Sequence, residues 1–195
     1  MRKMIIYAAT KNLKKKMKLS SEFSMDLYGL NVRLVVEEDA KFILNLRLDP
    51  ELGNFMNKVS SEIDAQIEWI REYKKRELEG VEYYFIYSRN GLPLGVNRMT
   101  NIQNDSWMGA SLIFKKDSGA GTPILASLIQ YHIGFETLDK SIHFGDQLKD
   151  NNKAIRFNKF MGSDFIHEDE NVFYIILSKR TYLKTKQKIE KMFLR

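Results

Sequence analysis

The sequence of 195 residues contains no cysteine, only three prolines and only three histidines. Without cysteine there is no disulfide framework, no thiol nucleophile and no thiolate zinc site. The histidines, His132, His143 and His167, lack the short spacing typical of metal sites, which argues against metal catalysis. The longest early apolar run, residues 4–9, is too short for a signal peptide or a membrane span. We therefore expect a cytoplasmic protein that uses neither disulfides nor a metal ion.

Positive charge is concentrated at the N-terminus. Residues 1–25 hold seven basic side chains and one acidic one, which accounts for the whole net charge of +6. Residues 26–195 carry the other 24 basic and 24 acidic side chains (31 less 7, and 25 less 1), so no excess charge indicates a nucleic-acid partner. We interpret residues 1–25 as a basic leader, disordered or weakly amphipathic, and residues 26–195 as one domain.

The rest of the chain mixes strand and helix patterns without an internal repeat. Apolar runs predict strands, and Asn90-Gly91 between two of them is typical of a type I′ hairpin turn. Apolar positions at helical spacing, with capping residues, predict helices. The predicted strands are 31–36, 81–88, 92–99, 107–114, 141–148 and 171–177, and the predicted helices are 39–47, 61–80, 123–138, 151–161 and 178–193. This order favours a mixed α/β sheet with helices on both faces.

A glycine-containing loop, KDSGAGT at residues 116–122, joins a predicted strand to a predicted helix. Its glycines let the backbone approach a ligand, and the helix start directs free N–H groups into the loop. Thr122 as N-cap and Pro123 as first helical residue mark the predicted helix start. No GK[ST] follows, and Ile124 stands where a dinucleotide fingerprint needs glycine. The loop therefore predicts an anion site that is neither a Walker loop nor a dinucleotide site.

The spacing basic-x-x-Gly-x-Gly of Lys116, Gly119 and Gly121 resembles the pyrophosphate loop of the GNAT superfamily of N-acetyltransferases. About thirty residues later, NNKAIRFNKFMGSDF at 151–165 is similar to that superfamily's Asn-x-x-Ala/Ser helix. The resemblance covers about residues 30–177. It implies a mostly antiparallel mixed sheet with a splayed strand pair that holds acetyl-CoA. It also implies acetyl transfer to a primary amine by direct attack in a ternary complex.

On this resemblance, acetyl-CoA would lie along the strand that precedes the loop. The backbone N–H of Leu112 or Ile113 would stabilise the thioester oxyanion. Asn151 would bind the pantetheine amides, with an ordinary N-cap as the alternative. The residues expected to bind acetyl-CoA are Leu112, Ile113, Phe114, Lys116, Ser118, Gly119, Ala120, Gly121, Thr122, Asn151 and Lys159.

Proton handling departs from the family's pattern. Many members have a tyrosine acid where this chain has Asn158, and an amide donates a hydrogen bond but no proton. We expect water to protonate the leaving thiolate, or Asn158 to be a surface residue. Candidate bases are His143, Asp146 and Glu82, with a packing role as the alternative for His143. Candidate acceptor-binding residues are Tyr83, Tyr84, Arg98 and Trp107. Because most of this group are aromatic residues on strands, the alternative is that they belong to the core.

Three segments, LRLDPELGNFM, QIEWIREYKKRELEGVEYYFIY and NNKAIRFNKFMG, are similar to acetyltransferases that act on aminosugars, often nucleotide-linked. The predicted partner is thus a small-molecule amine, an amino sugar or a nucleotide-linked amino sugar. Two rival interpretations stay open. One rival is acetylation of a protein N-terminus, because ribosomal-protein acetyltransferases share these motifs. The other is a CoA-binding module without turnover, which the missing tyrosine suggests. The oligomeric state stays open, with a homodimer as one option.

Overall fold

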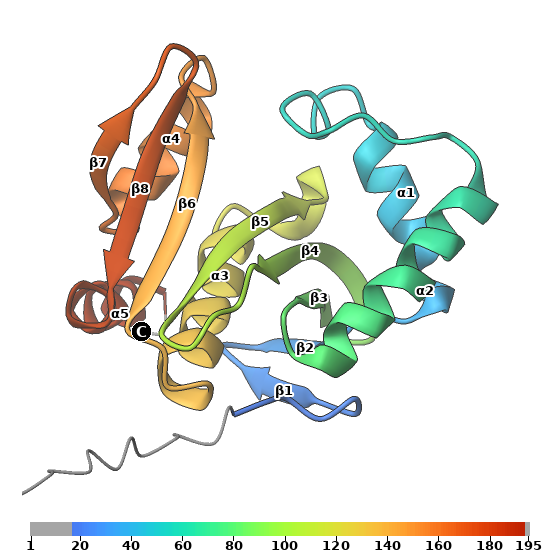
Figure 1. The fold of residues 1–195 in the computed structure, drawn as a ribbon, viewed down its shortest axis with the longest axis horizontal. Coiled ribbons are helices and arrows are strands. Elements are labelled where there is room, and N and C mark those ends of the chain that lie inside the picture. The colour runs from blue at the N-terminus through green and yellow to red at the C-terminus, as the bar shows by residue number, and fades with distance from the viewer. Residues whose placement is uncertain (1–16, 194–195) are drawn as a thin grey trace, which may run out of the picture.

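Residues 17–193, which the computed structural model describes, contain one sheet in the order β1-β2-β3-β4-β5-β6-β8-β7 (Figure 1). Neighbouring strands in it are antiparallel except for β5 and β6, which run parallel. The predicted mixed, mostly antiparallel α/β sheet is confirmed. The strands are β1 Ser24–Leu27, β2 Leu30–Leu34, β3 Tyr83–Arg89, β4 Leu92–Thr100, β5 Ser106–Phe114, β6 Ile142–Leu148, β7 Asp164–Glu168 and β8 Val172–Ser178.

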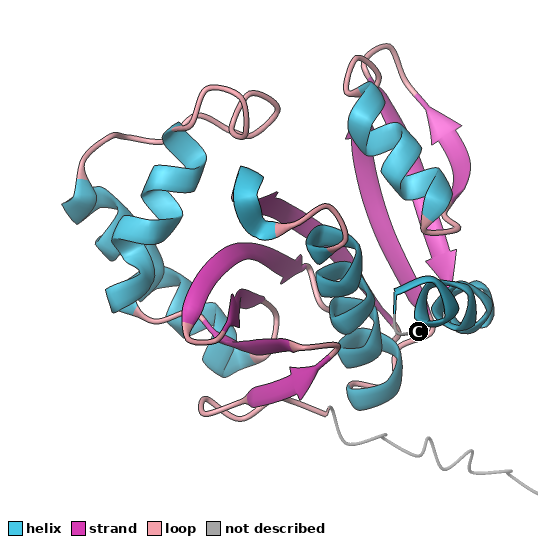
Figure 2. Cartoon of the chain, turned by 180° about the vertical axis from the view of Figure 1, so that it is seen from behind, coloured by secondary structure: helices cyan, strands magenta, loops and turns pink. Residues whose placement is uncertain are grey.

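Helices cover both faces of the sheet, as Figures 1 and 2 show. The helices α1 and α2 bury one apolar cluster, which includes Ile43, Ile70 and Ile113. The helices α3 and α5 bury a second cluster on the opposite face, which includes Leu128 and Tyr182. Their bounds are α1 Ala40–Leu48, α2 Ile63–Glu79, α3 Thr122–His132 with a π-helical turn at Ile133–Thr137, α4 Asn152–Phe160 and α5 Lys179–Phe193.

Local sequence signals explain several boundaries. Gly80 ends α2 in the left-handed conformation, with φ 69°, as expected for a C-cap glycine. Asn90 and Gly91 have φ values of 51° and 76°, which fits the type I′ turn between β3 and β4. Strands β1 and β7 were not predicted. Both are short edge strands: β1 alternates polar and apolar residues over only four positions, and β7 exposes most of its side chains.

Part of the predicted basic leader packs on the sheet. The N–H of Leu19 donates a hydrogen bond to the hydroxyl oxygen of Tyr83 at 2.9 Å. The ring of Phe23 packs edge-on against Phe85, with centroids 6.2 Å apart. These contacts and β1 tie the end of the leader to the domain. Residues 1–16 lie outside the described residues.

Candidate active site

The strands β5 and β6 pair over three residues and then separate. Residues 106–108 of β5 pair with residues 142–144 of β6, and the ladder continues no further. The edge of β5 that faces β6 is therefore open along residues 109–114, and Figure 1 shows the two strands diverging. Residues of both strands line a cleft of about 1320 Å³ that reaches both faces of the sheet.

A β-bulge shapes the open part of β5. Ser111 and Leu112 together stand opposite the single residue Asn97 of β4. Ser111 has φ 52°, a left-handed conformation that is uncommon for a residue with a side chain. Bulges bend a strand and redirect its backbone groups. This one lies on the wall of the cleft, at the predicted oxyanion site.

His143 closes the cleft at the point where the two strands meet. Its ring is 4% exposed and lies 5.2 Å from the ring of Trp107 and 5.0 Å from that of Tyr131, centroid to centroid. A Cβ on Gly109 would lie 2.6 Å from the His143 Nε2, so glycine permits this close approach. Burial lowers the pKa of His143 to about 3, because the imidazolium would lose its hydration. A neutral imidazole of this kind is a weak base near neutral pH.

The predicted anion loop opens α3 at the other side of the cleft. The helix begins at Thr122, with Gly121 as N-cap, so the predicted start at Pro123 is one residue late. The reason is that the Thr122 hydroxyl donates to the carbonyl oxygen of Ser118 instead of capping the helix. Gly119 has φ 92° and open space where a Cβ would stand, apart from one contact at 3.5 Å. The loop backbone is thus accessible to a ligand.

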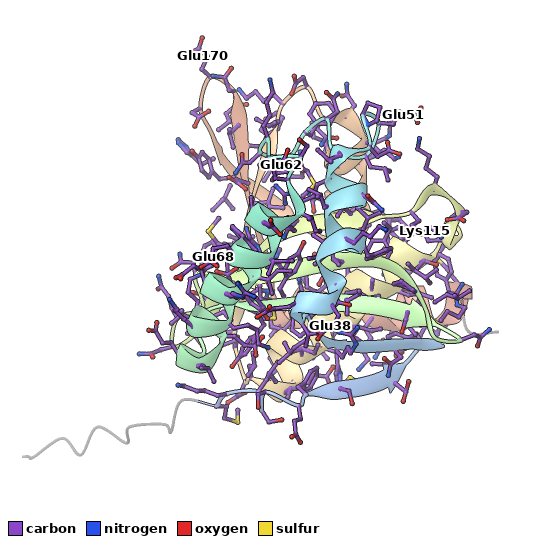
Figure 3. All side chains as sticks on the ribbon, turned by 90° about the vertical axis from the view of Figure 1, so that its right-hand side faces the viewer. Glu38, Glu51, Glu62, Glu68, Lys115 and Glu170 are labelled. Atoms are coloured by element: carbon purple, nitrogen blue, oxygen red, sulfur yellow. The ribbon has the colours of Figure 1, made fainter. Side chains whose placement is uncertain are left out.

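Lys116, the basic residue of the loop, has acidic partners in this structure. Its Nζ lies 3.0 Å from an oxygen of Glu51 and 3.4 Å from one of Asp49. The hydrogen bond with Glu51 raises the pKa of Lys116, so the amine stays charged. Figure 3 shows Glu38 at one end of α1 and Glu51 beyond the other end. Glu51 lies on the same side of the molecule as Lys115, which precedes Lys116 in the sequence. A phosphate at the loop would compete with these two carboxylates, of which Glu51 is exposed and Asp49 half-buried, and which are therefore weakly held partners.

Helix α4 contributes the amides that the sequence singled out. Asn151 caps α4 by accepting the N–H of Ala154 at 3.1 Å, and it also lines the cleft. Asn158 lines the cleft too, where its Nδ2 donates to Gln147 at 3.3 Å. Lys159 lies elsewhere, because its Nζ sits over a phenylalanine ring, 5.4 Å from the centroid.

Aromatic and cationic side chains line the cleft on the face covered by α1 and α2. The guanidinium of Arg98 lies 5.1 Å from the ring centroid of Trp69 and 5.8 Å from that of Tyr84. Its Nη1 is 3.2 Å from a carboxylate oxygen of Glu82. Burial raises the pKa of Tyr84 to about 12, although the charges of Arg47 and Arg98 oppose this. Two guanidinium groups therefore converge on one neutral phenol.

The structure gathers most of the predicted site residues in this cleft, and their roles there stay predictions. Six lie outside its lining: Lys159, Gly121 and Thr122, and the three residues described next. Tyr83 and Trp107 are 1% and 0% exposed and belong to the core, which is the alternative that the sequence left open. Glu82 is 7% exposed and paired with Arg76 as well as Arg98. Cleft-lining members of the predicted set are Tyr84, Arg98, Leu112, Ile113, Phe114, Lys116, Ser118, Gly119, Ala120, His143, Asp146, Asn151 and Asn158.

Several polar or aromatic cleft residues escaped the sequence analysis, among them Arg47, Trp69, Asn97 and Gln130. The Arg47 Nε, Asn97 Nδ2 and Gln130 Nε2 atoms are buried without a hydrogen-bond partner among residues 17–193. Such atoms are rare in folded proteins and are expected where a ligand completes the bonding. A polar side chain inside the apolar strand pattern of β4 was a usable signal for Asn97. The other three depend on tertiary contacts and carry no local signal.

Residues 17–193 contain neither a candidate metal site nor a candidate membrane-spanning helix. No group of three or more His, Cys, Asp or Glu side chains in that part of the chain could hold a metal ion. Among its helices, none has both the length and the apolar character needed to cross a bilayer.

Comparison with known proteins places this site in a family. The chain is 32% identical to a solved structure described as apo FdhC, a nucleotide-linked sugar GNAT, with a TM-score of 0.80 over 88% of this chain and 99% of that one. The fold and the splayed cleft define an acyl-CoA-dependent N-acetyltransferase. The chain belongs to the GNAT superfamily. It transfers an acetyl group to an amine, with acetyl-CoA as cosubstrate.

More distant structures share the fold. A ribosomal-protein-S5-alanine acetyltransferase from Vibrio fischeri has a TM-score of 0.70 at 14% identity, covering 80% of this chain and 97% of that one. A spermidine N-acetyltransferase from Vibrio cholerae, solved with CoA and spermine, has a TM-score of 0.69 at 17% identity, covering 80% of this chain and 99% of that one. No protein-family model and no curated protein matches the chain.

Proposed function

We propose that the acceptor is an amino sugar linked to a nucleotide, and that its amine attacks acetyl-CoA directly in a ternary complex. The observation that carries this proposal is the charge of the cleft wall. Six basic and two acidic residues line the cleft, and three of the basic ones, Arg47, Lys58 and Arg98, lie on the α1 and α2 side. The relative that is 32% identical is itself described as a nucleotide-linked sugar GNAT.

Arg47 provides the strongest support for an anionic acceptor. It donates to the carbonyl oxygen of Asn57 at 2.9 Å and has no carboxylate partner among the described residues. A partly buried guanidinium without a counter-charge is unfavourable, so an anion bound beside it is stabilised. A diphosphate supplies that anion, and Trp69 offers a ring for stacking.

The same wall disfavours the other acceptors. A polyamine carries several positive charges and would meet Arg47 and Arg98 with like charge. A peptide N-terminus brings no phosphate to satisfy them. Among the candidate bases, Asp146 is exposed on β6 and lines the cleft, whereas His143 is buried and neutral. We therefore assign the deprotonation of the acceptor ammonium to Asp146 or to water that it orients.

An acceptor panel tests the proposal. The panel holds a thymidine or uridine diphosphate amino sugar, the free amino sugar, spermidine and a peptide with a free N-terminus, and CoA thiol release is the readout. We expect the nucleotide-linked sugar to give the highest kcat/KM. Arg47→Met should raise its KM roughly 10- to 100-fold, the range for one charge-assisted hydrogen bond. Arg71→Met, at an exposed α2 position paired with Glu37, is the matched control. Preference for the peptide or for spermidine would overturn the proposal.

A further inference from the structure

The amide of Asn97 is fixed in orientation and has unused donors. Asn97 is 1% exposed, and its Oδ1 accepts the hydroxyl of Tyr87 at 3.0 Å. Tyr87 is 0% exposed, so leaving its hydroxyl hydrogen unpaired would be costly. The oxygen of the amide therefore faces Tyr87, and both N–H groups of Nδ2 face the other way. Nδ2 has no partner within residues 17–193.

Asn97 lies at the point of the sheet where β5 bulges. Ser111 and Leu112 stand opposite it across the β4–β5 ladder. Its neighbour Val96 packs into the cluster under α1 and α2, so Asn97 points to the opposite face, where Tyr87 lies. Asn97 also lines the cleft. A buried donor thus lines the cleft across the β4–β5 ladder from the bulge, beside the strand that binds the thioester in the predicted arrangement.

We propose that the Asn97 Nδ2 donates a hydrogen bond to the acyl carbonyl oxygen of acetyl-CoA, as a second oxyanion donor beside the β5 backbone. When the amine nitrogen bonds to the carbonyl carbon, the C=O π pair moves onto this oxygen. When that pair returns, the C–S bond breaks, the nitrogen loses a proton and the thiolate takes one up. Between these two steps the oxygen carries a negative charge, and a preorganised hydrogen-bond donor stabilises it. The proposal rests on acetyl transfer and not on the identity of the acceptor.

Two variants separate this role from a structural one. Tyr87→Phe removes the hydroxyl and leaves the Asn97 donors in place. The double variant Asn97→Leu/Tyr87→Phe replaces both partners of the buried hydrogen bond by apolar groups of similar shape. Such a double replacement is often nearly neutral for stability. We expect kcat of the double variant to be about 10²-fold below that of Tyr87→Phe, with an unchanged Kd for CoA. Asn101→Asp, at an exposed amide just beyond β4, is the control.

Infrared difference spectra of bound, ¹³C-carbonyl-labelled acetyl-CoA give a readout that needs no acceptor. A hydrogen bond to the thioester oxygen lowers its C=O stretching frequency. We expect this band to move to higher frequency in the double variant relative to Tyr87→Phe, and to stay in place in Asn101→Asp. An unchanged band overturns the proposal, as does a kcat within threefold of that of Tyr87→Phe. A loss confined to CoA affinity also overturns it. None of these results bears on whether the acceptor carries a nucleotide.

Discussion

Buried, neutral His143 predicts an unusually steep loss of stability in mild acid. Its pKa is lowered to about 3 in the folded protein, against about 6.5 in an unfolded chain. The unfolded state therefore binds the proton more readily, and the stability due to this group is complete above pH 6.5 and lost as the pH falls toward 3. At 1.36 kcal/mol per pH unit, the loss between pH 7.5 and 4.5 is about 2.7 kcal/mol. For a chain of this size that is a fall in Tm of roughly 5–10 °C.

The assay compares urea unfolding of the wild type, His143→Gln and His167→Gln at several pH values between 7.5 and 4.5. His143→Gln lacks the titrating group, so its stability relative to the wild type should improve by about 2.7 kcal/mol across this range. His167 is exposed on β7, and its variant should follow the wild type.

Hydrogen bonds from Lys186, Tyr182 and His132 outweigh burial and lower the pKa of Glu136 to about 2, so its contribution to stability is lost only below about pH 4.5.

Equal pH slopes for the wild type and His143→Gln would refute this reasoning. So would an imidazole resonance of His143 that titrates near pH 6.5, because the ring would then be accessible to water. In that case kcat/KM should rise with pH through about 6.5 in the wild type and not in His143→Gln. This result would identify His143 as the general base.

Three further outcomes are expected. Gly119→Val should weaken acetyl-CoA binding at least tenfold in a calorimetric titration, because φ 92° is strained for valine and the loop backbone must shift; unchanged affinity would remove the loop from the site. Asn158→Ala should lower kcat less than tenfold and Asn158→Tyr should not lower it, whereas a hundredfold loss for alanine would give the amide a direct part in the chemistry. Removing residues 1–24 should lower Tm, because Leu19 and Phe23 lose their contacts, while a chain that starts at Met17 should keep it.

The sequence predicted the sheet because its central elements have strong local signals. The Asn90-Gly91 turn, the Gly80 cap and the apolar run before the anion loop specify their conformation through φ preferences and periodicity. Edge strands β1 and β7 lack such signals. Their pairing depends on the neighbouring strand, and β7 has only one face that meets other side chains.

The candidate site was predictable where backbone carries the function and not where side chains converge. The KDSGAGT loop would act through N–H groups and a helix start, and glycine spacing makes this arrangement visible in the sequence. The Arg47, Trp69 and Arg98 cluster joins three elements that are far apart in sequence, so no spacing encodes it. Tyr83 and Trp107 were candidates because aromatic residues on strands either pack in a core or contact a ligand, and the sequence does not distinguish the two. Their burial in the structure places them in the core.

The divergence of β5 from β6 leaves polar backbone along one edge of a strand that is anchored in the core by Trp107, Ile113 and Phe114. Ile113 and Phe114 are 3% and 6% exposed, so the strand cannot turn away to satisfy its backbone in water. In a closed sheet each N–H of this edge would have a carbonyl partner, and an unpaired buried one is destabilising. The arrangement is sustained by the bulge at Ser111 and by His143, which occupies the space beside Gly109 where the strands part. We therefore expect a ligand with amide groups spaced along an extended chain, as in pantetheine, to complete this edge in the way a further strand would.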